Sequence, residues 1–223
     1  MTLELLCILW QPIVTLATGQ VLGHEALARF ADATPDAAFQ TAARLEQSVA
    51  LDRRCVALAL ADPPPEGLLF LNVTAATVRT GRFPPVPRAL RPRVVWELPE
   101  AAGWEAGAFL RLPPGTRCAL DDLGAGAAEL GRAAQVPWQY LKVDRRLIAG
   151  CDARPSAQAV IHGLVVIAQD AGGAVIAEGV ETAAEAACLR RLGVAYGQGY
   201  FWARPAPRPA PAVPAAPPSF QGG

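Results

Sequence analysis

Residues 93–98 read RVVWEL, an apolar run that carries Glu97 beside its end. Five other runs share this design, each apolar and each with an acidic, amide or lysine side chain near its end: VLGHEAL at 21–27, LLFLNV at 68–73, RCALDD at 117–122, YLKVD at 140–144 and AVIAEGVE at 174–181. A strand that is apolar on both faces belongs in a parallel sheet covered by helices. In a closed (β/α) barrel the carboxyl ends of such strands meet at one rim, where active sites lie. The pattern therefore predicts an α/β barrel with polar groups gathered at one rim.

The side chains at these strand ends are oxygen donors of the kind that hard divalent cations prefer. The candidate ligands are Glu25, Asn72, Glu97, Asp121, Asp122 and Glu178. Several carboxylates at one rim repel one another unless cations lie among them, and an amide oxygen adds a ligand without adding charge. Taken alone, the Asp-Asp pair is more typical of a helix N-cap and a solvated turn. Together the set predicts a site for divalent metal ions.

Two further polar residues stand in apolar surroundings. Lys142 lies inside an apolar strand, where a buried lysine needs a counter-charge or a task. One interpretation is a structural ion pair with Asp144, and the other is a lysine that orients a water nucleophile and offsets phosphoryl charge. Gln198 lies between two glycines, which let a ligand or the backbone approach closely. Its alternative is an ordinary polar turn.

Composition limits the class of protein. The chain has 223 residues, 52% of them apolar, with 20 basic and 20 acidic side chains. One domain is expected, and binding of duplex nucleic acid is disfavoured because the charges balance. Five scattered cysteines without a C-x-x-C pair favour a reducing cytoplasm. No apolar run is long enough to span a bilayer, so we expect a soluble protein without a membrane anchor.

Turn, capping and proline signals in the rest of the sequence predict the elements around these strands. An opening strand at 5–10 and a turn at Thr18-Gly19 predict an antiparallel start, and residues 35–60 predict two helices or one kinked helix broken at Asp52. Helices are also expected from Pro155 and from the capping box Thr182–Glu185 to Gly193, whereas residues 101–112 are a poor helix. Seven prolines between 205 and 218 predict that residues 206–223 form a disordered Pro/Ala-rich tail after a domain at 1–205.

Eight motifs follow one another along the chain, and Ala203-Arg204-Pro205 comes after them: QPIV at 11–14, EALAR at 25–29, LNV at 71–73, ELPE at 97–100, DDLGAG at 121–126, LKVD at 141–144, EGVET at 178–182 and GQGY at 197–200. In this order they resemble the motifs of the EAL-domain family of cyclic di-GMP phosphodiesterases. The resemblance implies a modified TIM barrel, (β/α)8, whose first strand is antiparallel, and hydrolysis of cyclic di-GMP to linear pGpG at a site with two Mg²⁺ or Mn²⁺ ions.

The resemblance also implies a role for each matching residue. Glu25, Asn72, Glu97 and Asp121 would bind the first cation, and Asp121, Asp122 and Glu178 the second. Lys142 would hold the attacking water, and Glu178, Glu181 and Gln198 would complete the catalytic side of the second metal. Arg29 and Gln11 would contact the substrate. Glu100 would support the loop that follows Asp122.

That loop departs from the family pattern. The family usually has DDFGTGYSS where this chain has DDLGAGAAE at 121–129, so the hydroxyl side chains of the loop are missing. The helices after Arg29 and Glu100 also look short. We expect a weaker second-metal site and an altered homodimer face. The alternative function is a receptor that binds cyclic di-GMP without cleaving it and signals through a protein partner, while the tail alone is open to a role in protein interaction.

Overall fold

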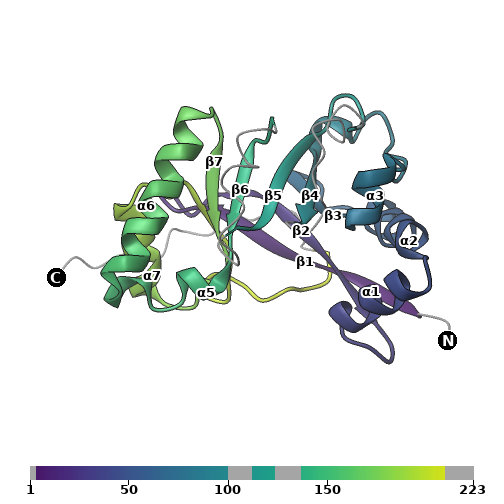
Figure 1. The fold of residues 1–223 in the computed structure, drawn as a ribbon, viewed down its shortest axis with the longest axis horizontal. Helices are drawn as coiled ribbons and strands as arrows, with labels where there is room; N and C mark the ends of the chain where they lie inside the picture. Colours follow the sequence, from purple (N-terminus) through teal and green to yellow (C-terminus); the bar gives the residue numbers. More distant parts are fainter. Residues whose placement is uncertain (1–3, 100–111, 124–136, 209–223) are drawn as a thin grey trace.

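Eight strands form a closed barrel in the computed structural model, which describes residues 4–99, 112–123 and 137–208 (Figure 1). The strands follow one another around the barrel in chain order: β1 (Leu5–Thr15), β2 (Val21–Phe30), β3 (Leu68–Asn72), β4 (Val94–Pro99), β5 (Arg117–Leu123), β6 (Tyr140–Val143), β7 (Ala174–Ala177) and β8 (Tyr196–Gly197). β1 runs antiparallel to both β2 and β8, and the other neighbouring pairs are parallel. The predicted barrel with an antiparallel first strand is confirmed.

Helices lie on two sides of the barrel, α1 to α3 on one side and α5 to α7 on the other (Figure 1). Their bounds are α1 (Pro35–Arg44), α2 (Ser48–Ala61), α3 (Ala75–Thr80), α5 (Arg145–Ile148), α6 (Pro155–Asp170) and α7 (Ala183–Arg191), with 3-10 turns η1 (Arg91–Arg93) and η4 (Cys151–Ala153). Two of the described helices are short, α3 with six residues and α5 with four. Of the two helices predicted to be short, the one after Arg29 is α1, which has ten residues, and the region after Glu100 lies outside the described residues up to Arg111. Within the described residues, no helix is both long and apolar enough to cross a membrane.

Residues 35–61 form two helices, one of the two predicted arrangements. The break was predicted at Asp52, and this was wrong. Asp52 lies inside α2 and is 1% exposed, whereas the chain turns at Leu45–Gln47, where Glu46 has a φ of 56°. A residue in the left-handed region ends a helix, and the polar Asp52 is tolerated in α2 because the next part of the chain supplies its hydrogen bonds.

The first strand is longer than predicted, because it continues through Gln11 and Pro12 to Thr15. Pro12 pairs with His24 of β2. Backbone groups alternate between the two sides of a strand. The side on which Pro12 lacks an N–H is the side on which Trp10 bonds to Ala206 and Val14 pairs with Gly197. Pro12 therefore falls between two partners and costs the sheet no hydrogen bond.

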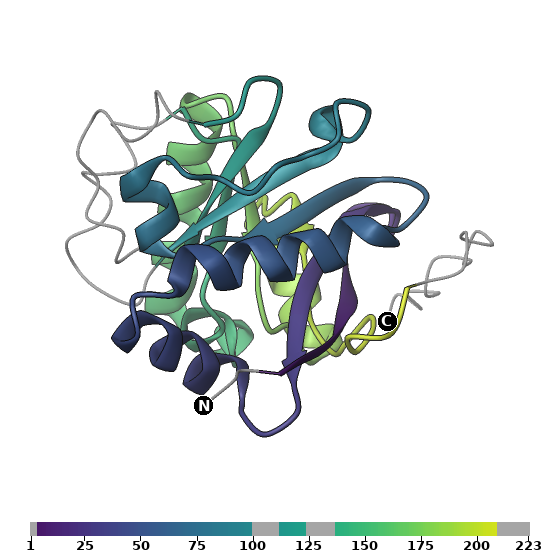
Figure 2. The ribbon, with the colours of Figure 1, turned by 90° about the vertical axis from the view of Figure 1, so that its right-hand side faces the viewer.

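The chain after β8 returns to the barrel. Ala206 exchanges two backbone hydrogen bonds with Trp10, at 2.7 and 3.0 Å, and Arg208 forms an exposed ion pair with Asp62. Figure 2 shows this C-terminal segment, in yellow, beside β1, in purple. Residues 209–223 and 100–111 lie outside the described residues, so the disordered tail and the poor helix at 101–112 stay predictions.

The core has two layers because each strand alternates its side chains. Residues such as Leu69, Leu71, Trp96 and Leu98 face outward and pack under the helices. Ile13, Phe70, Val95, Ala119 and Ile176 face inward and fill the barrel, all 0% exposed. β4 is consequently buried along residues 94–98, which is what its uninterrupted apolar sequence predicted.

Candidate metal-binding active site

Every strand of the barrel contributes one polar side chain to the layer above the apolar plug. The plug consists of the inward-facing residues Ile13, Phe70, Val95, Ala119, Tyr140, Ile176 and Tyr196. The polar layer consists of the residues two positions away from them, in the same order Gln11, Asn72, Glu97, Asp121, Lys142, Glu178 and Gln198, together with Glu25 from β2. A two-residue step returns a side chain to the same face of a strand. The plug and the polar layer are thus successive inward positions on the same strands.

Lys142 lies at the centre of this layer and is 1% exposed. Its Nζ lies 2.6 Å from Glu97 Oε1, 2.8 Å from Glu178 Oε1, 3.1 Å from Asp121 Oδ1 and 3.4 Å from Glu25 Oε2. Lys142 is thus ion-paired, as one interpretation expected, but Asp144, the partner suggested for it, is not among its partners. Asp144 instead accepts from the backbone N–H of Arg146 at 2.7 Å and caps α5.

The charges around Lys142 decide how the layer is protonated. Burial alone would lower the pKa of Lys142, but Asp121 and the three glutamates outweigh it and raise that pKa well above its usual value. Burial would raise the pKa of Glu25, but Lys142 and hydrogen bonds from Gln198 and Asn72 lower it below its usual value. The lysine is therefore held as an ammonium and Glu25 as a carboxylate.

Glu97 and Glu178 behave differently. Burial and the neighbouring Glu25 raise the pKa of Glu97 well above its usual value, against the pull of Lys142. Burial raises the pKa of Glu178 to about 8, again opposed by Lys142. One ammonium does not compensate four carboxylates, so without another cation the site retains protons near neutral pH.

Amide side chains hold Glu25 in place. Asn72 Nδ2 donates to Glu25 Oε1 at 2.9 Å, and Gln198 Nε2 donates to Glu25 Oε2 at 2.7 Å. Gln198 Nε2 also lies 3.1 Å from Gln11 Oε1, and Gln11 Nε2 donates to the Ala203 carbonyl at 3.0 Å. Both ends of the Gln11 side chain thus contact other parts of the chain.

The glycines beside Gln198 have a packing explanation. A Cβ at Gly199 would overlap the backbone of Val180, and one at Gly197 would overlap the ring of Trp202. Close approach of the backbone is therefore borne out at Gly199, whereas at Gly197 side chains occupy the space. The tight packing places Gln198, which is 4% exposed, with its amide toward Glu25.

The donor set of this layer fits a hard divalent cation. Among the described residues, Glu97 Oε2 and Gln198 Oε1 are buried oxygens without a hydrogen-bond partner, and Asn72 donates through its nitrogen and keeps its oxygen as an acceptor. Carboxylate and amide oxygens of this kind are ligands for Mg²⁺ or Mn²⁺. Among the described residues, no three acidic, histidine or cysteine side chains are placed so that they could hold an ion as they stand. Glu97 and Glu178 face the Lys142 ammonium instead.

The strand that carries the paired aspartates is irregular at that point. The pairing of β5 with β6 shifts register between Leu120 and Leu123. Asp121 meets Lys142, as described above, and Asp122 lies in the irregular stretch of β5. Residue 100 and the loop at 124–136 lie outside the described residues, so the support expected from Glu100 and the altered loop are expectations still.

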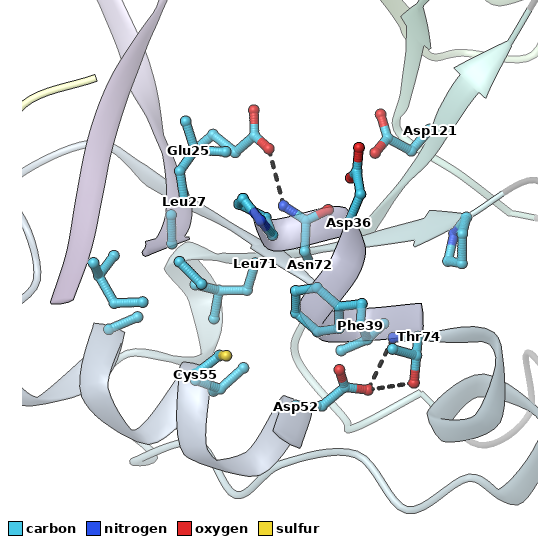
Figure 3. A pocket seen from close by; sticks show the side chains of 18 of the residues that line it. Glu25, Leu27, Asp36, Phe39, Asp52, Cys55, Leu71, Asn72, Thr74 and Asp121 are labelled. Carbon is cyan, nitrogen blue, oxygen red and sulfur yellow. Dashed lines mark hydrogen bonds between the residues drawn. The ribbon is translucent and has the colours of Figure 1, made fainter. Parts of the chain in front are cut away.

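A cavity of about 670 Å³ opens from the carboxylates toward α1 and α2 (Figure 3). Glu25, Asn72 and Asp121 lie at one end, and apolar side chains such as Phe39 and Leu71 line the deeper part. The predicted substrate contact Arg29 lines this cavity and donates to the Ala28 carbonyl at 3.0 Å.

Sequence reasoning missed Asp52 as a residue of this cavity. Asp52 Oδ2 accepts hydrogen bonds from Thr74 N, Thr74 Oγ1 and Thr77 Oγ1 at 2.6 to 2.8 Å, while its buried Oδ1 has no partner among the described residues. Burial raises the pKa of Asp52 against these hydrogen bonds. The signal was an acidic residue in the otherwise apolar register of α2.

A second cavity, of about 270 Å³, lies on the side of β7 and β8. Its lining includes Glu25, Glu178, Gln11 and Gln198, together with Glu181 and Tyr200. Glu181 is half-exposed and lies 3.5 Å from Arg145, so it borders the site without contacting the central lysine. Both cavities share Glu25, and the polar layer therefore lies between them.

Comparisons with known proteins agree with this arrangement. The family model for the EAL domain matches residues 2–205. The cyclic di-GMP phosphodiesterase RocR of Pseudomonas aeruginosa is 38% identical over 93 residues, which are 42% of this chain and 24% of that relative. A manganese and cyclic di-GMP complex of Klebsiella pneumoniae BlrP1 superposes with a TM-score of 0.76 at 26% identity, covering 90% of this chain and 56% of that one. A standalone EAL protein of Vibrio cholerae O395, bound to cyclic di-GMP, superposes over the whole of both chains with a TM-score of 0.76 at 24% identity.

Proposed function

This chain belongs to the EAL domain family of cyclic di-GMP phosphodiesterases, and on that premise we propose that it is an active, metal-dependent member that hydrolyses cyclic di-GMP to linear pGpG. The observation that carries the proposal is the convergence of Glu25, Glu97, Asp121 and Glu178 on one buried lysine from separate strands. A layer with this excess of negative charge, placed between two cavities, is suited to cations and a phosphodiester.

The residues that would hold two divalent ions come from five strands or their ends. Glu25, Asn72, Glu97 and Asp121 would bind one ion, and Asp121, Asp122 and Glu178 the other, each with a preference for Mg²⁺ or Mn²⁺. When bound, such ions supply Lewis-acid polarisation of the phosphoryl oxygens and lower the pKa of water. The buried Glu97 Oε2 supports this assignment, because it lacks a hydrogen-bond partner within the described residues.

The chain's own groups have separable tasks in the proposal. Lys142 is a fixed ammonium that can orient the attacking water and offset charge on the phosphoryl group. Gln198 and Asn72 hold the Glu25 carboxylate by hydrogen bonds to its two oxygens. Arg29, at the wall of the larger cavity, would bind a substrate phosphate. Glu181 would act at the border of the second cavity.

The two cavities support a substrate with two similar halves. A cyclic dinucleotide laid across the polar layer could place one base on each side and a phosphodiester between them. The larger cavity has an apolar wall, with Phe39 and Leu71, that is suited to a base plane.

Incubation of the purified protein with cyclic di-GMP and Mg²⁺ or Mn²⁺, followed by chromatography of the nucleotides, tests the proposal. We expect pGpG to accumulate, to vanish with a chelator, and to vanish in Glu25→Ala. The altered sequence at 121–129 favours the second candidate, a non-cleaving cyclic di-GMP receptor. Binding of the nucleotide without formation of pGpG in the presence of either metal would establish that candidate and refute the proposed enzymatic activity.

The five cysteines, all free thiols, support a cytoplasmic location.

A further inference from the structure

A backbone segment beyond the barrel reaches the metal layer through one side chain. Residues 203–206, which we call the strap, follow β8 and pair antiparallel with the middle of β1 at Trp10. The strap bonds to β1 twice through its backbone, at Trp10 with Ala206, and once through a side chain, at Gln11 with the Ala203 carbonyl. Trp10 and Gln11 are neighbours in sequence, so at this point the strap contacts both the backbone of the strand and one of its side chains.

Gln11 continues this connection inward. Its Oε1 accepts from Gln198 Nε2, the same nitrogen that donates to Glu25 Oε2. Gln11, Gln198 and Glu25 are 8%, 4% and 7% exposed, so water does not compete effectively for these bonds. Gln11 also stands directly opposite Glu25 in the register of β1 and β2. The orientation of the Glu25 carboxylate therefore depends on where the strap holds Gln11.

We propose that Gln11 is a positioning residue that transmits the placement of the strap to Glu25, and that residues 203–206 are thereby part of the metal-binding machinery. The inference rests on the proposed function only in taking Glu25 as a metal ligand. It differs from the role in substrate contact expected for Gln11, because both ends of its amide bind within the chain. Groups that orient a metal ligand typically change metal affinity by 10- to 100-fold when they are removed.

The metal arm of the test is titration of the full-length protein with Mn²⁺ alone. Gln11→Met keeps the side-chain volume and removes both hydrogen bonds, and we expect it to raise the Kd for Mn²⁺ about tenfold or more. Gln139→Met is the matched control. The Gln139 side chain also joins two backbone segments, because it accepts from Cys118 N at 2.9 Å and donates to the Pro137 carbonyl at 3.1 Å, but it lies at the start of β6, away from Glu25. The control should bind Mn²⁺ as the parent does. Equal affinities for Gln11→Met and Gln139→Met would overturn the proposal.

The second experiment is done without metal. It therefore tests the role of Gln11 even if the parent does not bind Mn²⁺ and the proposed function is refuted. Ala206→Pro removes the N–H that bonds to Trp10, and Glu25→Gln removes the charge of the ligand. Their effects on denaturant unfolding in chelator should be non-additive in the parent and additive once Gln11→Met is present. Arg208→Ala, which breaks only the exposed pair with Asp62, should be additive with Glu25→Gln throughout. Additivity of the strap variant with Glu25→Gln in the parent would show that no connection exists. Truncation after Pro205, which removes Ala206 and its N–H, replaces the proline variant if the latter does not fold.

Discussion

Replacing Lys142 with methionine removes the one ammonium from the centre of the polar layer. Lys142 is also the only lysine among the 20 basic residues of the chain. Its Nζ contacts four carboxylates within 3.4 Å, and in the metal-free protein they would then face one another without a counter-charge. Loss of one partner from a buried charge cluster costs about 3–5 kcal/mol. For a chain of this size that corresponds to a fall in Tm of roughly 6–20 °C.

The size of the loss should depend on pH and on metal. More of the carboxylates are ionised at pH 8 than at pH 6, because burial raises the pKa of Glu97 and Glu178 and both can take up protons at the lower pH. We therefore expect Lys142→Met to be more destabilised in chelator at pH 8 than at pH 6. A divalent cation supplies the missing charge, so Mn²⁺ should raise the Tm of the variant more than that of the parent. Hydrolysis should stay lost in both conditions, because a cation does not replace a group that orients water.

Thermal unfolding in chelator and in Mn²⁺, at both pH values, measures these effects, and nucleotide chromatography measures turnover. Arg145→Met is the control for stability, since its ion pair with Glu181 is exposed on both sides and is worth less than about 1 kcal/mol. A variant as stable as the parent in chelator at pH 8 would show that the ammonium does not compensate the carboxylates. Full turnover in Lys142→Met would remove Lys142 from the catalytic proposal.

Four further predictions follow from the same geometry. Asp121→Ala should abolish hydrolysis, and pGpG formation by this variant would argue against a shared ligand for two ions. In the metal-free protein the pKa of Glu178 is about 8 in the folded state and 4.5 in the unfolded state, so the free energy of unfolding should decrease as the pH rises between these values. Glu178→Gln should make that free energy depend less on pH, which unfolding curves recorded at several pH values would measure. Selective ¹³C labelling of lysine should give one NMR signal whose pKa lies above 10.5 in chelator and decreases when Mg²⁺ occupies the carboxylates; an unchanged value on saturation would refute the competition. Truncation after Arg208 should leave Tm and turnover unchanged, whereas truncation after Pro205 should lower Tm because it removes the pairing of Ala206 with Trp10.

The barrel and its polar rim could be predicted because both depend on local sequence pattern. Uninterrupted apolar runs are required by strands that are covered on both faces, and RVVWEL is buried along its length for that reason. The polar side chains could be assigned to one rim because parallel strands end together. What the pattern could not supply was the partner of each residue. Lys142 was weighed against Asp144, two residues away, but its partners come from four other strand ends.

Two misses have the same physical origin. Asp52 was taken as a break in a helix, although its hydrogen bonds come from Thr74 and Thr77, more than 20 residues later in the chain. The strap was assigned to the boundary of a disordered tail because proline-rich composition predicts little packing, yet Ala206 pairs with Trp10 at the other end of the sequence. In both cases a local signal was correct about the residue's polarity or composition, and a distant partner decided its structure.

The polar layer combines two requirements that conflict without metal. A cation site needs carboxylates close together, and a folded barrel cannot bury several of them ionised. Lys142 reduces this conflict, since its ammonium lies where the carboxylates converge and its own pKa rises in response. Protons on Glu97 and Glu178 reduce it further. Under the proposed function, binding of divalent ions would displace protons and draw carboxylates away from Lys142, and the ammonium would then be free to act on water and phosphate. Lys142 would thus stabilise the layer in one state and assist hydrolysis in the other, and metal affinity should increase with pH until the glutamates are ionised.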